Sequence, residues 1–145
     1  MNTILNPTQS DTKQGAVTYP AAVDLTAREG YLAKLANNAG ATNLALPTAT
    51  DDFAVLIIGS GDVAGNFSIA ESPSVNETCR VVLKGACSPG DELSLADPSV
   101  PADAGKLRKR PTTTGTWRTL FIAEETGVDG QIVLCRRVGE RTTTI

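Results

Sequence analysis

The segment Trp117-Arg118-Thr119-Leu120-Phe121-Ile122-Ala123 is followed by Thr126-Gly127-Val128-Asp129-Gly130 and then by a second apolar segment, Gln131 to Val138. β-Branched and aromatic residues are frequent in both apolar segments, whereas Gly and Asp in the connection favour a turn. Two such segments on either side of a short glycine-containing loop predict an antiparallel hairpin. The C-terminal third of the chain is therefore expected to be sheet.

Earlier segments show the same preference for strands. Apolar side chains alternate with polar ones in four short segments, where the apolar members are Leu44 with Leu46, Phe67 with Ile69, Cys79 with Val81 and Leu83, and Leu93 with Leu95. A period of two is what a half-buried antiparallel strand requires, so we expect these apolar side chains to face a core. The continuously apolar run Phe53 to Ile58 predicts a strand buried on both faces. Lys106 to Lys109 is expected to be a short edge strand, whose charges discourage aggregation between sheets.

The segment around Gly30 allows two interpretations. Gly30 to Leu35 could be a strand that ends at the turn Asn37-Asn38-Ala39-Gly40, or a helix could begin at Thr26 and end at Gly40. A glycine inside that helix would cost about 1 kcal/mol relative to alanine. The strand is therefore favoured.

Together these segments predict an all-β protein of eight or nine short strands, folded as a small β-barrel or β-sandwich. Helical patterns that would alternate with the strands in a βαβ fold are missing from the sequence. Residues 1–22 are polar, contain two prolines and show no sustained period, so we expect an extended N-terminal arm that is either disordered or ordered only against a partner. The β domain is expected to span residues 23–140, with a frayed tail at residues 141–145.

The charge distribution indicates protein partners rather than nucleic acid. The net charge is −3, but residues 1–100 contain 5 Lys or Arg and 11 Asp or Glu, whereas residues 101–145 contain 8 and 5. A chain with one acidic and one basic part suits docking between proteins, while a nucleic-acid-binding domain is expected to be basic. The sequence also lacks an apolar run long enough for a membrane helix, and its N-terminus does not resemble a secretory signal. We expect neither membrane nor nucleic acid as a partner, and synthesis in a cytoplasm.

The residues that enzymes commonly use are scarce. The sequence has no histidine, which removes Ser-His-Asp and Cys-His catalysis and histidine-ligated zinc. The three cysteines, Cys79, Cys87 and Cys135, have no metal-binding spacing, so reduced thiols that pack as small apolar residues are expected. The glycine-rich segment from Gly59 to Gly65 has its third glycine one position too late for a dinucleotide-binding motif, and a strand pattern follows it. We therefore predict a protein that is not an enzyme and uses neither cofactor nor metal.

Two groups of residues are candidates for contact with a partner. The first group is apolar and lies in the arm, namely Ile4, Leu5, Val17 and Tyr19. The second group is the basic cluster Lys106, Arg108, Lys109 and Arg110, to which we add Trp117. The basic cluster is either a solvated sheet edge or a salt-bridged contact with an acidic partner. Nucleic-acid binding is a weaker third possibility, because aromatic residues are not interleaved with the charges.

The chain from Asp24 to Arg137 resembles the small β-rich decoration, or cement, proteins of tailed-phage capsids. The segments that carry the resemblance are Asp24-Leu25-Thr26-Ala27-Arg28-Glu29-Gly30, Leu44-Ala45-Leu46-Pro47, Val82-Leu83-Lys84-Gly85, Pro89-Gly90-Asp91-Glu92-Leu93, Phe121-Ile122-Ala123-Glu124-Glu125 and Asp129-Gly130-Gln131-Ile132-Val133. The resemblance implies a compact β-barrel or sandwich that binds the outside of an expanded capsid, often as homotrimers at three-fold positions. It also implies the major capsid protein as partner, a virion location and a role in stabilising the shell. A tail or head–tail connector β-barrel and a ligand-binding β module are the alternatives.

Overall fold

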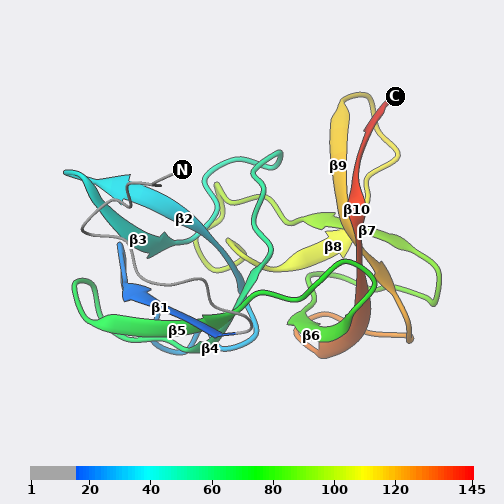
Figure 1. Ribbon diagram of the computed structural model, residues 1–145. Helices are drawn as coiled ribbons and strands as arrows, with labels where there is room; N and C mark the ends of the chain where they lie inside the picture. Colours follow the sequence, from blue (N-terminus) through cyan, green and yellow to red (C-terminus); the bar gives the residue numbers. More distant parts are fainter. Residues whose placement is uncertain (1–15) are drawn as a thin grey trace, which may run out of the picture.

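A computed structural model describes residues 16–145, which form ten strands and, within that range, no helix (Figure 1). The strands are β1 (Ala16–Pro20), β2 (Leu32–Asn38), β3 (Ala41–Ala45), β4 (Leu56–Ser60), β5 (Phe67–Glu71), β6 (Thr78–Val82), β7 (Glu92–Leu95), β8 (Leu107–Lys109), β9 (Thr116–Ala123) and β10 (Ile132–Thr144). The predicted all-β class, a small barrel or sandwich, is confirmed. Nothing in the described range is a helix long and apolar enough to cross a bilayer.

The strands form two five-stranded antiparallel sheets that lie side by side (Figure 1). The first sheet has the order β1-β5-β4-β2-β3, and the second has the order β6-β10-β9-β7-β8. Each sheet curls so that its two edge strands approach each other. Ala21, which follows β1, forms a parallel bridge to Leu44 of β3, and Leu83, which follows β6, forms a parallel bridge to Leu107 of β8. We call residues 16–71 the first module and residues 78–145 the second module.

The two modules share one topology, since adding five to each strand number of the first sheet reproduces the order of the second. The pairing register is also the same. Pro20 pairs with Phe67 at the end of β1, and Val82 pairs with Ile132 at the end of β6. The chain is thus an internal repeat of a five-stranded unit.

Backbone hydrogen bonds outside the strands repeat as well. The amide of Ala22 donates to Leu44 O at 2.8 Å, and the amide of Lys84 donates to Leu107 O at 2.7 Å. Gly65 and Gly130 occupy the same turn position with φ angles of 88° and 82°, a left-handed conformation that glycine adopts without steric cost. Equivalent turns therefore hold equivalent strands in the two modules.

The modules are joined by a shared core. The second module encloses a cluster of fully buried side chains, of which the largest are Phe121, Leu83, Leu93, Leu95, Leu107 and Leu120. Four buried side chains of the first module belong to the same cluster, namely Leu32, Ala54, Val55 and Ile57. Because these side chains complete the core of the second module, we expect the two modules to unfold together.

The structure differs from the predicted domain boundaries at both ends. Residues 16–20 fall in the predicted arm but form β1, which pairs with β5 along its whole length because Val17 and Tyr19 pack against a second core cluster. This cluster, the first-module core, consists of Ala21, Leu25, Ala33, Leu44, Ile58 and Ala70. Residues 141–144 fall in the predicted frayed tail but continue β10, where the β-branched Thr142 and Thr143 pair with β9. β1 raises the strand count from the predicted eight or nine to ten, whereas the longer β10 adds no strand.

The predicted orientation of β5 is wrong. Ser68 and Ala70 are fully buried, whereas Phe67 and Ile69 face outward. The interior of the curled first module is already filled by larger side chains such as Leu44 and Ile58, so the small residues of β5 face inward. Ser68 Oγ also accepts a hydrogen bond from the amide of Asp62 at 2.9 Å, which satisfies its buried hydroxyl oxygen.

The segment after Gly30 forms the strand β2, as favoured, and not the alternative helix, while Gly30 itself lies in the preceding turn. β2 and β3 form a hairpin whose two turn residues, Ala39 and Gly40, have φ angles of 51° and 86°. Positive φ at both positions is the type I′ geometry that matches the twist of a two-residue hairpin. Asn37 Oδ1 accepts a hydrogen bond from the Gly40 amide at 2.9 Å and closes the turn.

Asp52 connects β2 to the loop that precedes β4. Its Oδ2 accepts hydrogen bonds from Lys34 Nζ at 2.7 Å, the Thr48 amide at 2.7 Å and the Ala49 amide at 3.1 Å. Burial alone would raise the pKa of Asp52, but these hydrogen bonds and the Lys34 charge outweigh it and lower the pKa to about 2. The ionised carboxylate therefore stabilises the folded state.

We expect Asp52→Asn to lower the free energy of unfolding by about 2 kcal/mol at pH 7, because a depressed pKa is linked to stability. This contribution is complete above the unfolded pKa near 3.8 and is lost as the pH falls through the folded value of about 2. Urea denaturation at pH 7 and at pH 2 measures the difference, with the exposed neighbour Asp51→Asn as the control. A difference between wild type and Asp52→Asn that persists unchanged at pH 2 would contradict this origin of the stability.

Candidate interaction surface

The predicted basic cluster lies on and around β8, which is an edge strand as expected. Most of its charges are paired within the chain: Lys106 with Asp103 at 2.9 Å, Lys109 with Asp91 at 3.1 Å, and Arg110 with Glu92 at 2.8 Å. The hydrogen bond from Lys106 lowers the pKa of Asp103, and hydrogen bonds from the Ser88 amide and Lys109 lower the pKa of Asp91. An acidic partner would therefore have to compete with carboxylates that are already in place.

Arg108 and Trp117 lie together. The Arg108 guanidinium is 5.4 Å from the centroid of the Trp117 ring, a cation–π distance. Trp117 Nε1 donates a hydrogen bond to Thr113 O at 3.0 Å, which fixes the ring against the loop before β9. Both side chains are half-buried, so this pair offers a preformed surface for contact rather than a flexible one.

The predicted apolar contacts of the arm fall into two groups. Val17 and Tyr19 lie on β1, and their half-buried side chains pack against the first-module core. Ile4 and Leu5 lie outside the described residues. Val17 and Tyr19 therefore stabilise the fold, in addition to any contact that they make with a partner.

The outer face of β1 and β5 carries apolar residues that the sequence assigned to a core. Phe67 is 68% exposed and Ile69 is 44% exposed. The register places Pro20 opposite Phe67 and Thr18 opposite Ile69, so the four side chains form one patch, which we call the β1–β5 patch. An exposed phenylalanine that the fold does not bury is typical of a contact surface.

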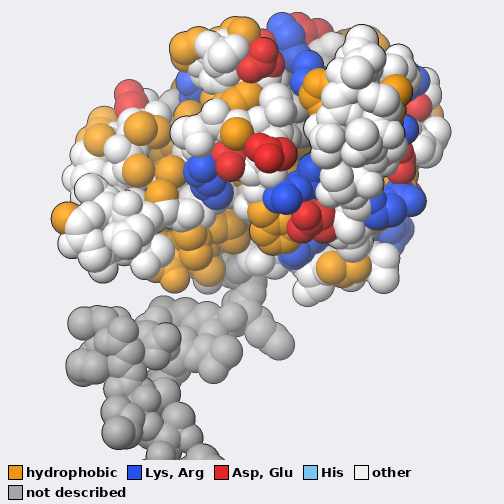
Figure 2. Space-filling model, turned by 90° about the horizontal axis from the view of Figure 1, so that it is seen from above, with side chains coloured by type: hydrophobic (Ala, Val, Ile, Leu, Met, Phe, Trp, Pro, Cys, Tyr) orange, Lys and Arg blue, Asp and Glu red, His pale blue; other side chains and the backbone are white. Residues whose placement is uncertain are grey.

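Charge is unevenly distributed over the surface. Figure 2 shows Lys, Arg, Asp and Glu side chains intermixed over the second module, at the right of that view. The left end of the same face, over the first module, is mostly apolar or uncharged. On this face, the first module therefore carries less charge than the second module and is the better suited of the two to a protein interface.

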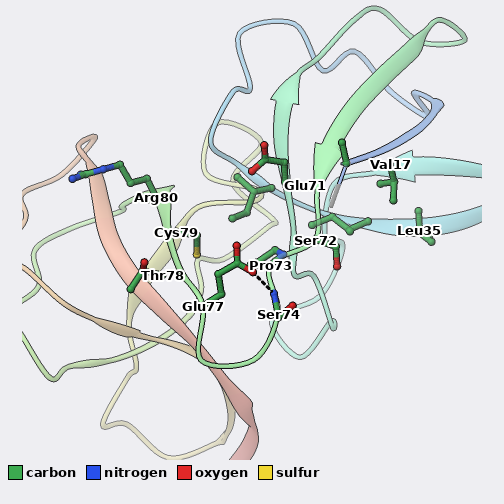
Figure 3. A pocket seen from close by; sticks show the side chains of 13 residues that line it. Val17, Leu35, Glu71, Ser72, Pro73, Ser74, Glu77, Thr78, Cys79 and Arg80 are labelled. Atoms are coloured by element: carbon green, nitrogen blue, oxygen red, sulfur yellow. Dashed lines mark hydrogen bonds between the residues drawn. The ribbon is translucent and has the colours of Figure 1, made fainter. Parts of the chain in front are cut away.

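A cleft of about 1040 Å³ lies beside the shared core and is lined by residues of both modules. Val17, Leu35 and Leu56 line it from the first module, and Thr78, Cys79 and Arg80 line it from β6 (Figure 3). Residues 72–77, which link the two modules, also contribute to the lining, and within them the Ser74 amide donates a hydrogen bond to Glu77 Oε2 at 2.8 Å. In residues 16–145, no group of three or more Cys, Asp or Glu side chains could hold a metal ion.

Comparison with protein families gives no match, and no curated protein matches the sequence. Comparison with solved structures finds the N base of the head fiber gp8.5 of bacteriophage phi29. The two folds superpose with a TM-score of 0.64 at 14% sequence identity, over 84% of this chain and 92% of that chain. The likeness shows that the fold is shared.

Proposed function

We propose that this chain is a structural protein of a tailed-phage virion that binds the outer capsid surface and stabilises contacts between major capsid protein subunits. The observation that carries the proposal is the fold likeness over 84% of the chain to the base of a phage head fiber. The sequence resemblance to capsid decoration proteins supports the same role. The protein acts by binding and not by catalysis, is made in the host cytoplasm and is located on the capsid in the virion.

The β1–β5 patch is the proposed capsid contact. Phe67 and Ile69 stand on a sheet face held by paired strands on both sides of β5, so they meet a partner with little loss of conformational entropy. The basic residues around β8, together with Ile4 and Leu5, remain further proposed contacts. A homotrimer is proposed as the bound form, because a closed ring at a capsid three-fold position lets three copies bind cooperatively.

The test is binding of the purified full-length protein to expanded capsids that lack decoration. We expect saturable binding at a fixed number of copies per major capsid protein, measured by co-sedimentation and quantitative gel analysis. The molar mass of the free protein, measured by light scattering, shows whether trimers form before binding. Failure to bind, combined with a few copies per purified virion, would favour a tail or head–tail connector protein instead.

A further inference from the structure

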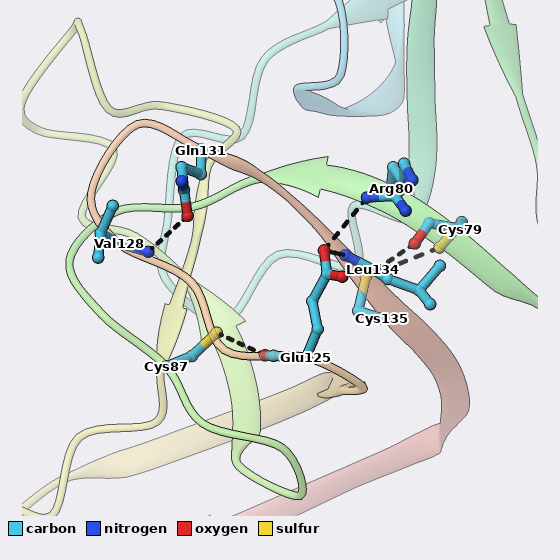
Figure 4. A network of polar contacts seen from close by, with 8 residues as sticks. All are labelled: Cys79, Arg80, Cys87, Glu125, Val128, Gln131, Leu134 and Cys135. Atoms are coloured by element: carbon cyan, nitrogen blue, oxygen red, sulfur yellow. Dashed lines mark hydrogen bonds and ion pairs between the residues drawn. The ribbon is translucent and has the colours of Figure 1, made fainter.

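Cys79 and Cys135 face each other across two neighbouring strands. They are direct partners in the antiparallel register of β6 and β10, and their Sγ atoms are 3.8 Å apart (Figure 4). Paired residues of antiparallel strands have Cα atoms about 4.5–5.5 Å apart, which falls inside the range that disulfides span. An S–S bond of about 2.05 Å would therefore need a shift of the side chains and no rearrangement of the strands.

The two thiols differ in access and reactivity. Cys79 is half-buried and lines the cleft between the modules (Figure 3), while Cys135 is fully buried and is not among the residues that line the cleft. The hydrogen bond with Cys135 lowers the pKa of Cys79, and the same contact together with burial raises the pKa of Cys135. Cys79 is thus the thiol that a reagent in the cleft meets first, and it is the more readily ionised of the two.

The fold does not require sulfur at these positions. In the first module the equivalent partners are Val17 and Ala70, which pair in the same register between β1 and β5. The remaining cysteine, Cys87, is buried, and its Sγ donates to Glu125 O at 3.6 Å (Figure 4). Burial raises the pKa of Cys87, so the Cys87 thiol is expected to react slowly and serves as an internal control for the other two.

We propose that Cys79 and Cys135 form a thiol modification site at which a low-molecular-weight disulfide, such as oxidised glutathione, generates an intramolecular disulfide across β6 and β10. The Cys79 thiolate attacks one sulfur of the small disulfide and expels a thiolate, leaving a mixed disulfide on Cys79. The deprotonated Cys135 sulfur then attacks Cys79 Sγ and expels the second thiolate. Two protein thiols are oxidised, one small disulfide is reduced to two thiols, and the departing thiolates take up the two protons.

The bond would fix an edge of the second sheet. β6 is the terminal strand of its sheet, and the loop closed by the bond contains β7, β8 and β9. Constraining this loop reduces the freedom of the unfolded chain and stabilises the fold. Because a reducing cytoplasm keeps such thiols reduced, the protein would be cross-linked only in an oxidising environment, whatever partner it binds.

The experiment treats the full-length protein with oxidised glutathione and measures intact mass, peptide maps and thermal unfolding. We expect the loss of two hydrogen atoms in the intact mass, a Cys79–Cys135 peptide, an unchanged molar mass and a Tm about 10 °C higher that dithiothreitol reverses. Cys87→Ala is expected to behave like the wild type. Cys135→Ala should instead stop at a mixed disulfide that carries one glutathionyl group on Cys79.

Wild-type protein that keeps both thiols, or that retains glutathionyl groups without closing the Cys79–Cys135 bond, would overturn the proposal. So would a cross-link that involves Cys87 in place of Cys135. The wild-type result decides the question by itself, so a variant that folds poorly does not weaken the test. Capsid binding is a separate measurement, and its failure would leave this site unaffected.

Discussion

Replacing Gly61 by alanine is expected to lower the free energy of unfolding by about 3 kcal/mol or more, because the added methyl group would overlap a backbone that cannot move aside. A Cβ atom at Gly61 would lie 2.0 Å from Leu25 O and 2.7 Å from Leu25 C. Leu25 is fully buried, and its amide donates to Asp62 O at 2.9 Å. Relieving the overlap would require Leu25 to leave the first-module core or to give up this hydrogen bond.

The matched control is Gly139→Ala in β10. A Cβ atom there would have no neighbour within 4 Å, so we expect a change of at most about 0.5 kcal/mol. Urea denaturation followed by tryptophan fluorescence and by circular dichroism measures both variants. Equal stabilities for the two alanine variants would show that the close approach to Leu25 does not require glycine at position 61.

The all-β class could be predicted because the pattern that defines it is local. Alternation over a few residues, as in Cys79 to Leu83, and glycine-containing turns, as between Thr126 and Gly130, are visible without knowledge of any distant contact. The face that each strand buries is not a local property. On β5 the large residues Phe67 and Ile69 point outward, because the interior is filled from other strands and leaves room only for Ser68 and Ala70.

The internal repeat left a signal in the sequence that the strand-by-strand interpretation did not use. Val63-Ala64-Gly65-Asn66-Phe67-Ser68-Ile69-Ala70 aligns with Val128-Asp129-Gly130-Gln131-Ile132-Val133-Leu134-Cys135, and the structure places the two segments in equivalent positions. Only Val63 with Val128 and Gly65 with Gly130 are identical, so a comparison of the sequence with itself gives a weak match here. The same alignment pairs Phe67 with Ile132, which is likewise exposed.

The candidate site could be predicted only in part. Lys106 to Lys109 was recognisable as a charged edge strand, because strong charge within a short apolar segment is a local feature. The ion pairs that neutralise these charges could not be predicted, because Asp91, Glu92 and Asp103 come close to β8 only through strand pairing and loop closure. Placing β1 in the arm was an error of the same kind, because its pairing partner β5 lies some fifty residues further along the chain.

The largest functional effect is expected from the double substitution Phe67→Ser and Ile69→Ser, which removes the apolar part of the β1–β5 patch. If the proposed capsid contact is correct, burying these side chains contributes about 2–3 kcal/mol, and their loss weakens capsid binding roughly 30- to 150-fold. The fold should be little affected, because both side chains are largely outside the core. Co-sedimentation with expanded capsids over a range of protein concentrations measures the affinity.

Val100→Ser is the control, because Val100 is 46% exposed and lies in the second-module loop between β7 and β8, not in the β1–β5 patch. Full binding by the control and weak binding by the double variant would assign the contact to the first module. If all three proteins bind equally, the patch is not the contact, and the basic surface around β8 becomes the next candidate. Because neither Phe67 nor Ile69 belongs to a core cluster, loss of binding without loss of stability would mean that these exposed residues serve contact with a partner.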